Sequence, residues 1–170
     1  MGLLGKKDDT LEVYKEIADI LGIPEQKQGM IDNPRQYYAD NAERYEERSI
    51  EGDDVDDDEI RWFGIIDELM DMQKGWSFDF SFYLEDFTDC IEVIKPKELS
   101  LDGISLNEDD DITIWAKAIN DSWEPLGYVF AALEIDGDEF NTFVCTKSDF
   151  EKLADLAKRI GHRIDLVQNL

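Results

Sequence analysis

The stretch Trp76-Ser-Phe-Asp-Phe-Ser-Phe82 alternates large aromatic residues with small polar ones. In a strand, successive side chains point to opposite sides of the sheet, so a period of two gives the strand one apolar and one polar side. Only a half-buried strand uses such a pattern well. We therefore predict a strand over residues 76–82.

A β-hairpin is predicted farther along the chain. Residues 128–135 and 140–146 are rich in aromatic and β-branched side chains, which favour strands. They flank the turn Asp136-Gly-Asp-Glu139, and Asp-Gly is a favoured pair in hairpin turns. A short strand over residues 162–167 is expected to close the chain.

Apolar residues recur at helical spacing in the remaining segments. Asn33 suits the start of one helix, and Ser148 suits the start of the last one. Gly22 and Gly161 are suited to end the first and last helices. The predicted helices cover residues 11–21, 34–48, 60–74, 84–94, 112–123 and 148–160.

The order of these elements indicates the fold class. From Trp76 onward it is strand, helices, strand, strand, helix, strand, which is the split βαβ arrangement of ferredoxin-like folds. We predict an α+β fold with an antiparallel four-stranded sheet in ferredoxin-like order and helices on one face. The acidic run over residues 51–59 is too charged to pack, so we place a boundary there. Residues 1–52 are then a helical N-terminal extension, and residues 53–170 an acidic α+β domain.

Acidic residues dominate the charge of the chain. There are 17 Lys and Arg residues against 42 Asp and Glu residues, which gives a formal net charge of −25. Residues 1–49 hold 7 basic and 11 acidic side chains, whereas residues 50–170 hold 10 and 31. Such a field repels nucleic acids and anionic membrane surfaces, and it attracts cations or a basic protein. Solubility alone also explains part of this charge.

Several features indicate a cytoplasmic protein. The apolar start ends at Lys6, which is too short for the core of a signal peptide. The longest apolar run, over residues 128–133, is too short to span a membrane. Cys90 and Cys145 are expected to be reduced residues of the core.

Familiar catalytic motifs are absent from the sequence. There is no nucleophile elbow, phosphate-binding loop or dinucleotide fingerprint, and His162 is the single histidine. The runs 53–59, 109–111 and 136–139 offer clustered oxygens of the kind that Ca²⁺ or Mg²⁺ binds, but none fits an EF-hand loop. Helix starts and a turn explain the same runs, so we predict no cofactor.

Three segments carry a resemblance to a known family. They are Arg61-Trp-Phe-Gly-Ile-Ile-Asp-Glu-Leu69, the acidic helix around Trp115, and Leu156-Ala-Lys-Arg-Ile-Gly-His-Arg-Ile164. Together they resemble a bacterial domain-of-unknown-function family of small acidic proteins. The resemblance covers roughly residues 55–167 and leaves the first 50 residues outside. It implies a compact domain of bacterial origin, and it brings no activity, ligand or catalytic residue.

The acidity and the lack of active-site motifs favour a non-enzymatic interaction protein. One specific form is an immunity protein, whose acidic face covers the basic site of a toxin nuclease. A cation-binding module or hydrolase centred on His162 is an alternative, and so is self-association through exposed tyrosines of the N-terminal helices. On the leading hypothesis, the partner-binding charges are Asp56, Asp57, Asp58, Glu59, Asp109, Asp110 and Asp111.

Overall fold

Helices and one antiparallel sheet make up the computed structural model, which describes residues 2–170, with side chains from Asp9 onward. The chain divides into two compact units, Met1–Leu69 and Met70–Leu170. The domain boundary after residue 52 stays a prediction. Along the sequence, the two units divide near the end of the helix Asp57–Asp71, which follows the acidic run. None of the described helices is both long and apolar enough to cross a membrane.

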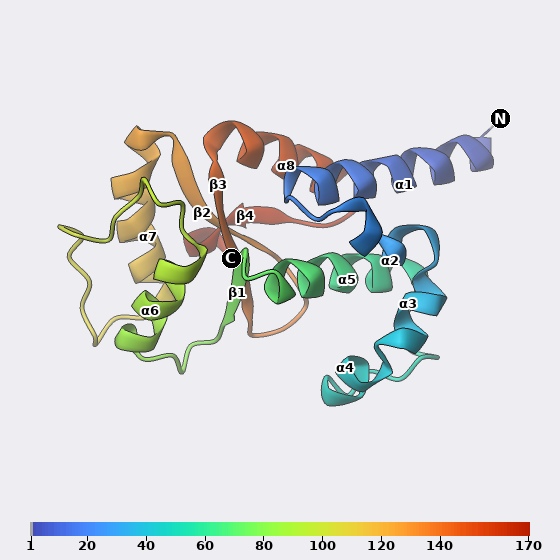
Figure 1. Cartoon of the computed structure of the whole chain (residues 1–170), viewed down its shortest axis with the longest axis horizontal. Coiled ribbons are helices and arrows are strands. Elements are labelled where there is room, and N and C mark those ends of the chain that lie inside the picture. The colour runs from blue at the N-terminus through green and yellow to red at the C-terminus, as the bar shows by residue number, and fades with distance from the viewer. Residues whose placement is uncertain (1) are drawn as a thin grey trace. The chain divides into compact units, whose positions relative to one another are not determined.

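The first unit consists of helices (Figure 1). Its elements are α1 (Gly2–Ile20), the 3₁₀ turn η1 (Glu25–Lys27), α2 (Gly29–Asp32), α3 (Pro34–Asp40), α4 (Ala42–Glu47) and most of α5 (Asp57–Asp71). Helix α1 begins well before residue 11. The single helix predicted over residues 34–48 is wrong, because Asn41 separates α3 from α4. The Asn41 side chain donates to the carbonyl of Tyr37 at 2.9 Å, and so competes with the helical backbone bonds.

Two glycines end helices as the sequence predicts. Gly22 follows α1 and Gly161 follows α8 (Lys147–Arg159), each with φ of 79°, a left-handed conformation that glycine adopts without strain. After each glycine, the next backbone N–H reaches back to a carbonyl of the last turn, at 2.9 Å in both cases. This is the Schellman arrangement, which satisfies carbonyl groups that a helix end leaves open.

Helix α5 is the central element of the first unit. Ile60 and Ile65 are fully buried. The guanidinium group of Arg61 donates to the carbonyl of Ile31 in α2 at 2.9 Å. The buried Asp67 carboxylate accepts two hydrogen bonds from Arg48, so a charge that would be costly alone is paired. These bonds hold α2 and the end of α4 to α5.

The second unit is built on a four-stranded antiparallel sheet, which confirms the predicted α+β class. Its elements are β1 (Gly75–Phe78), α6 (Leu84–Ile94), α7 (Ile112–Trp123), η2 (Glu124–Leu126), β2 (Tyr128–Leu133), β3 (Phe140–Thr146), α8, β4 (Ile164–Leu166) and η3 (Val167–Asn169). The hairpin of β2 and β3 forms as predicted, with Tyr128 opposite Thr146 and Leu133 opposite Asn141.

Two local predictions need correction. Strand β1 ends at Phe78, because the Asp79 carboxylate accepts the backbone N–H of Ser81 at 2.7 Å and turns the chain. Helix α8 begins before Ser148, and Thr146 caps it by accepting the N–H of Asp149 at 3.1 Å.

The ferredoxin-like strand order is not confirmed. The order is β1-β3-β2-β4, so β3 separates β1 from β2 as in the split βαβ arrangement, but β4 pairs with β2 and not with β1. Crossovers between parallel strands are right-handed. β1 is parallel to β2, and β3 is parallel to β4, because all neighbouring strands are antiparallel. The connections from β1 to β2 and from β3 to β4 each pass one strand in the same direction across the sheet. The first pair of strands, however, points opposite to the second pair. Their helices must therefore lie on opposite faces.

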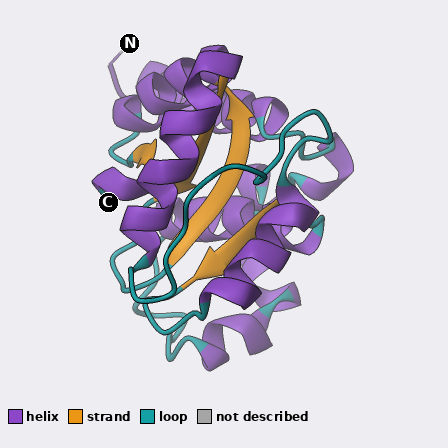
Figure 2. Cartoon of the chain, turned by 90° about the vertical axis from the view of Figure 1, so that its left-hand side faces the viewer, coloured by secondary structure: helices purple, strands orange, loops and turns teal. Residues whose placement is uncertain are grey.

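The packing agrees with this rule, so the predicted placement of helices on one face is wrong. Phe130 and Ala132 of β2 join a core cluster with residues of α6 and α7, such as Phe87 and Trp115. Helix α8 packs on β2, β3 and β4 from the other side of the sheet. In Figure 1 the strands lie between α7 and α8, and Figure 2 views the side of α6 and α7.

Substitution of Gly64 should destabilise the first unit although it lies in a helix. A Cβ atom on Gly64 would lie 2.7 Å from the Cβ and Cγ atoms of Met30. Ala normally favours a helix over Gly by up to about 1 kcal/mol, but overpacking costs roughly 1–3 kcal/mol. We expect Gly64→Ala to lower the free energy of unfolding in urea. Gly29→Ala is the matched control, because no atom lies within 4 Å of its Cβ position. Equal stability of the two variants would contradict this packing.

Candidate functional site

An acidic groove lies between the start of α6 and the loop that precedes α7. Its volume is about 640 Å³, and its lining residues are Tyr83, Leu84, Glu85, Thr88, Glu108 and Asp109. Three of them are carboxylates, and neither Lys nor Arg is among them. The groove belongs entirely to the second unit. We name it the acidic groove.

The start of α6 forms one wall of the acidic groove. Leu84, Glu85 and Thr88 lie in its first turns, and residues three or four apart share one face of a helix. Tyr83 precedes the helix with an extended backbone, φ −78° and ψ 148°. Tyr83 is 78% exposed, whereas Phe87 one turn later is fully buried in the core. The chain therefore turns one aromatic ring into the core and leaves another at the edge of the groove.

The loop before α7 forms the other wall, and Asn107 fixes its shape. The indole N–H of Trp115 donates to the Asn107 carbonyl at 2.7 Å, which ties the loop to the buried face of α7. The Asn107 side chain accepts the N–H of Asp109 at 3.0 Å, and its carbonyl accepts the N–H of Asp110 at 3.1 Å. The position of the Asp109 backbone is thus set by the core.

The charge of the groove is uncompensated among the described residues. No described ion pair involves Glu85, Glu108 or Asp109. Carboxylates near the start of α6 are also favoured by the helix dipole. Beside them, the exposed ring of Tyr83 offers a π-face on which a cation can rest. This combination suits an ammonium or guanidinium group.

The other predicted partner-binding residues of the second run lie next to the groove. Asp110 is half-buried and Asp111 is exposed. Asp111 caps α7, because its carboxylate accepts the N–H of Thr113 at 2.9 Å and of Ile114 at 3.2 Å. The hydroxyl of Thr113 and these N–H groups hold the pKa of Asp111 below its usual value. Of this run, only Asp109 lines the groove.

The first acidic run has local structural roles in the first unit. Asp56 accepts the N–H of Glu59 at 2.8 Å at the start of α5. Asp57 forms an ion pair with Arg35 at 2.8 Å, and Asp58 accepts the hydroxyl of Tyr14. The Glu59 side chain is exposed. The structure does not relate this run to the acidic groove, because the two lie in different units.

His162 lies in a second hollow, of about 430 Å³, with Glu134, Asp136 and Arg163. Arg163 approaches Glu134 at 3.9 Å and pairs with Asp165 at 2.8 Å. Within the described part of the chain, no three His, Cys, Asp or Glu side chains come together as metal ligands. The backbone N–H of His162 completes the C-terminal cap of α8. These observations give the alternative of a His162-centred metal site no support.

The cysteines and two tyrosines of the N-terminal helices lie partly or fully buried in the protein. Cys90 and Cys145 are free, as predicted, and burial raises the pKa of both thiols, that of Cys145 to about 12. Tyr37 and Tyr45 are buried. The expectation of exposed tyrosines on the N-terminal helices is therefore wrong for these two, whereas Tyr38 is half-buried. Self-association stays a prediction.

Removal of the Asp111 cap should give a pH-dependent loss of stability. We expect Asp111→Ala to lower the free energy of unfolding by about 1 kcal/mol at neutral pH. A carboxyl whose pKa is lower in the folded protein adds stability above its unfolded value, here 3.8, and loses it as the pH falls through the folded value. Urea denaturation should show the difference from wild type shrinking below about pH 4. Asp109→Ala, which leaves the cap intact, should cost less stability than Asp111→Ala at neutral pH.

Loss of the Trp115 hydrogen bond should loosen the loop wall of the groove. Trp115→Phe keeps an aromatic ring but removes the donor to the Asn107 carbonyl. Hydrogen exchange at the amides of Asp109 and Asp110 should become faster, because both bond to Asn107. Trp76→Phe is the control, since Trp76 packs against the same core without contacting Asn107 in any described hydrogen bond. Unchanged exchange in the Trp115 variant would show that the bond does not hold the loop.

The chain matches one family model, that of DUF6630, described as a domain of unknown function, over residues 12–167. No curated protein and no solved structure matches it. The match begins within α1, so the expectation that the first 50 residues lie outside the family domain is wrong. Bacterial origin stays a prediction. The predicted resemblance is confirmed, and the chain belongs to the DUF6630 family of domains of unknown function.

Proposed function

We propose that this chain is a non-enzymatic binding domain whose acidic groove holds a basic segment of a partner protein. One observation carries the proposal: the lining of the groove combines three carboxylates with an exposed tyrosine and no basic side chain. Arg is the residue best suited to such a groove, because its guanidinium group pairs with carboxylates and stacks on aromatic rings. Tyr83 is the aromatic contact, and Glu85, Glu108 and Asp109 supply the charge.

The charge of the whole chain supports a basic partner. Residues 50–170 hold 31 acidic and 10 basic side chains. A field of this sign accelerates the approach of a positively charged protein, while the contacts in the groove determine where the partner docks. The same field disfavours nucleic acid and anionic membranes as partners.

An immunity-type inhibitor is the specific form of this proposal. Such a protein would present the acidic groove to the basic, nucleic-acid-binding site of a toxin and so compete with the phosphate backbone. The predicted residues Asp110 and Asp111 would add charge beside the groove. Asp56, Asp57, Asp58 and Glu59 would contribute to the long-range field, since three of them already have partners within the first unit.

A charge-neutralising variant tests the proposal. The groove variant combines Glu85→Gln, Glu108→Gln and Asp109→Asn, and the control variant combines Glu43→Gln, Glu47→Gln and Asp155→Asn at exposed sites elsewhere. Both change the net charge equally. The probe is a labelled peptide of alternating Arg and Ala, followed by fluorescence anisotropy at low and high salt.

We expect the groove variant to weaken peptide binding by about tenfold, because exposed ion pairs contribute roughly 0.5 kcal/mol each and 1.4 kcal/mol is a factor of ten. The control variant should weaken it much less. Tyr83→Ala should also weaken binding, with no change in its salt dependence. Equal effects of the two triple variants would show that the peptide responds to net charge alone and would overturn the proposed site.

A further inference from the structure

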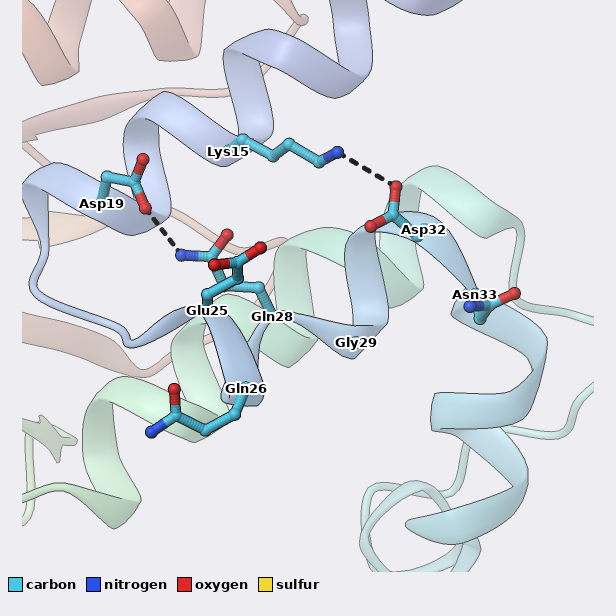
Figure 3. A pocket seen from close by; sticks show the side chains of 8 residues that line it. All are labelled: Lys15, Asp19, Glu25, Gln26, Gln28, Gly29, Asp32 and Asn33. Atoms are coloured by element: carbon cyan, nitrogen blue, oxygen red, sulfur yellow. Dashed lines mark hydrogen bonds and ion pairs between the residues drawn. The ribbon is translucent and has the colours of Figure 1, made fainter.

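The polar hollow of the first unit is held together by its own side chains (Figure 3). Gln28 is buried, and its amide nitrogen donates to the Asp19 carboxylate and to the carbonyl of Ile23, both at 2.8 Å. Lys15 pairs with Asp32 at 3.2 Å. These bonds join α1 to α2 and to the segment before α2, so the fold accounts for the polar residues of this hollow.

A hollow of a different kind lies beside the turn between β2 and β3, within the second unit. Its volume is about 140 Å³, and four apolar side chains line it: Phe80, Ile135, Phe140 and Leu170. An apolar cavity of about 150 Å³ holds a group the size of benzene. This hollow therefore has room for one aliphatic side chain. We name it the apolar hollow.

Phe80 forms an exposed aromatic wall of the apolar hollow. The Asp79 carboxylate closes the turn that ends β1 and so fixes the backbone around Phe80. The ring packs edge-on against Phe140, with the ring centroids 5.2 Å apart, yet 59% of Phe80 is exposed. A single exposed apolar side chain is ordinary, but here the half-buried Ile135 and Leu170 lie around the same hollow. A partner side chain in the hollow removes this apolar surface from water, which is favourable.

The carboxylates around the apolar hollow determine the charge of its occupant. Glu134, Asp138 and Glu139 are exposed and line it, and the lining contains neither Lys nor Arg. Arg163 approaches Glu134 at 3.9 Å, but no described ion pair involves Asp138 or Glu139. Such a rim repels an acidic segment and attracts a basic one. The matching occupant is therefore an apolar side chain that belongs to a basic protein segment.

One short connection joins the apolar hollow to the acidic groove. Phe80 lines the hollow and Tyr83 lines the groove, and both lie between β1 and α6. Three residues of chain span at most about 11 Å, so the Cα atoms of Phe80 and Tyr83 are no farther apart than that. An extended segment advances about 3.4 Å per residue. A partner segment of a few residues is therefore long enough to contact both aromatic rings.

We infer that a basic partner segment inserts one aliphatic side chain into the apolar hollow while its arginines lie in the acidic groove. The inference rests on the proposed function and adds an apolar anchor to it. Asp138 and Glu139 attract the positive charges that flank this anchor. The charge of the chain attracts any basic segment, whereas the anchor selects segments that carry a leucine-sized residue close to their arginines.

Peptides that differ in one residue test the inference by fluorescence anisotropy with the full chain. Each labelled peptide has alternating Arg and Ala followed by an alanine tail, and the test peptides carry one Leu two, four or six positions into that tail. We expect the best of the Leu peptides to bind about tenfold more tightly than the alanine-tail peptide, because a Leu side chain leaves water.

The variant Phe80→Ala should abolish this preference for Leu, because it removes the exposed wall of the hollow. Leu126→Ala is the matched control, since Leu126 is 62% exposed in the same unit and lines neither the hollow nor the groove. It should keep the preference. Urea denaturation checks that both variants are folded. Equal binding of the Leu and alanine-tail peptides to wild type, or a preference that survives Phe80→Ala, would overturn the inference.

Charge variants test the rim and separate the two proposals. Asp138→Asn with Glu139→Gln should weaken binding of the Leu peptide more than Glu43→Gln with Glu47→Gln, which removes the same charge from exposed sites elsewhere. Equal weakening would overturn the role of the rim. The acidic groove fails on a different result, namely equal effects of the groove variant and its charge-matched control on the alanine-tail peptide, whatever the preference for Leu.

Discussion

The right-handedness of crossover connections is the constraint on which the second unit depends. Once β4 pairs with β2, the helix between β3 and β4 must lie on the face opposite to α6 and α7. The sheet is then covered on both sides. Strand β2 shows the result, because five of its six residues are buried and Tyr128 alone is half-buried. A layered α/β/α arrangement follows from the position of one short strand.

The place of β4 beside β2 could not be predicted from local sequence patterns, although one feature of the sequence indicated a sheet covered on both faces. The hairpin and helices α6 and α7 were predictable because their apolar spacing is local. By contrast, β4 has three residues, which do not specify the edge of the sheet that they join. The signal lay in β2, whose sequence Tyr128-Val-Phe-Ala-Ala-Leu133 is apolar throughout. Such a run is typical of a strand buried on both faces, unlike the alternating stretch that begins at Trp76.

The candidate site was predictable only in part, for a related reason. Charge runs identified Asp109, but they also identified Asp56 and Asp111, which cap helices. Sequence alone does not separate a carboxylate that caps a helix from one that faces solvent in a groove. Glu85 and Tyr83 were missed because they meet Asp109 only through the folding of the second unit. Tyr83 lies between a predicted strand and a predicted helix. It fits neither the alternating apolar pattern of the strand nor the apolar spacing of the helix.

The loop that precedes α7 has a consequence for the energetics of recognition. Two indole groups from the core hold this loop. The Trp115 N–H donates to the Asn107 carbonyl, and the Trp123 N–H donates to the Ser100 carbonyl at 3.0 Å. A surface loop usually loses conformational entropy when a partner binds, and that loss lowers affinity. Here the core has ordered the wall of the acidic groove in advance. The backbone of this wall is therefore preorganised, and a ligand would not have to order the loop in order to bind.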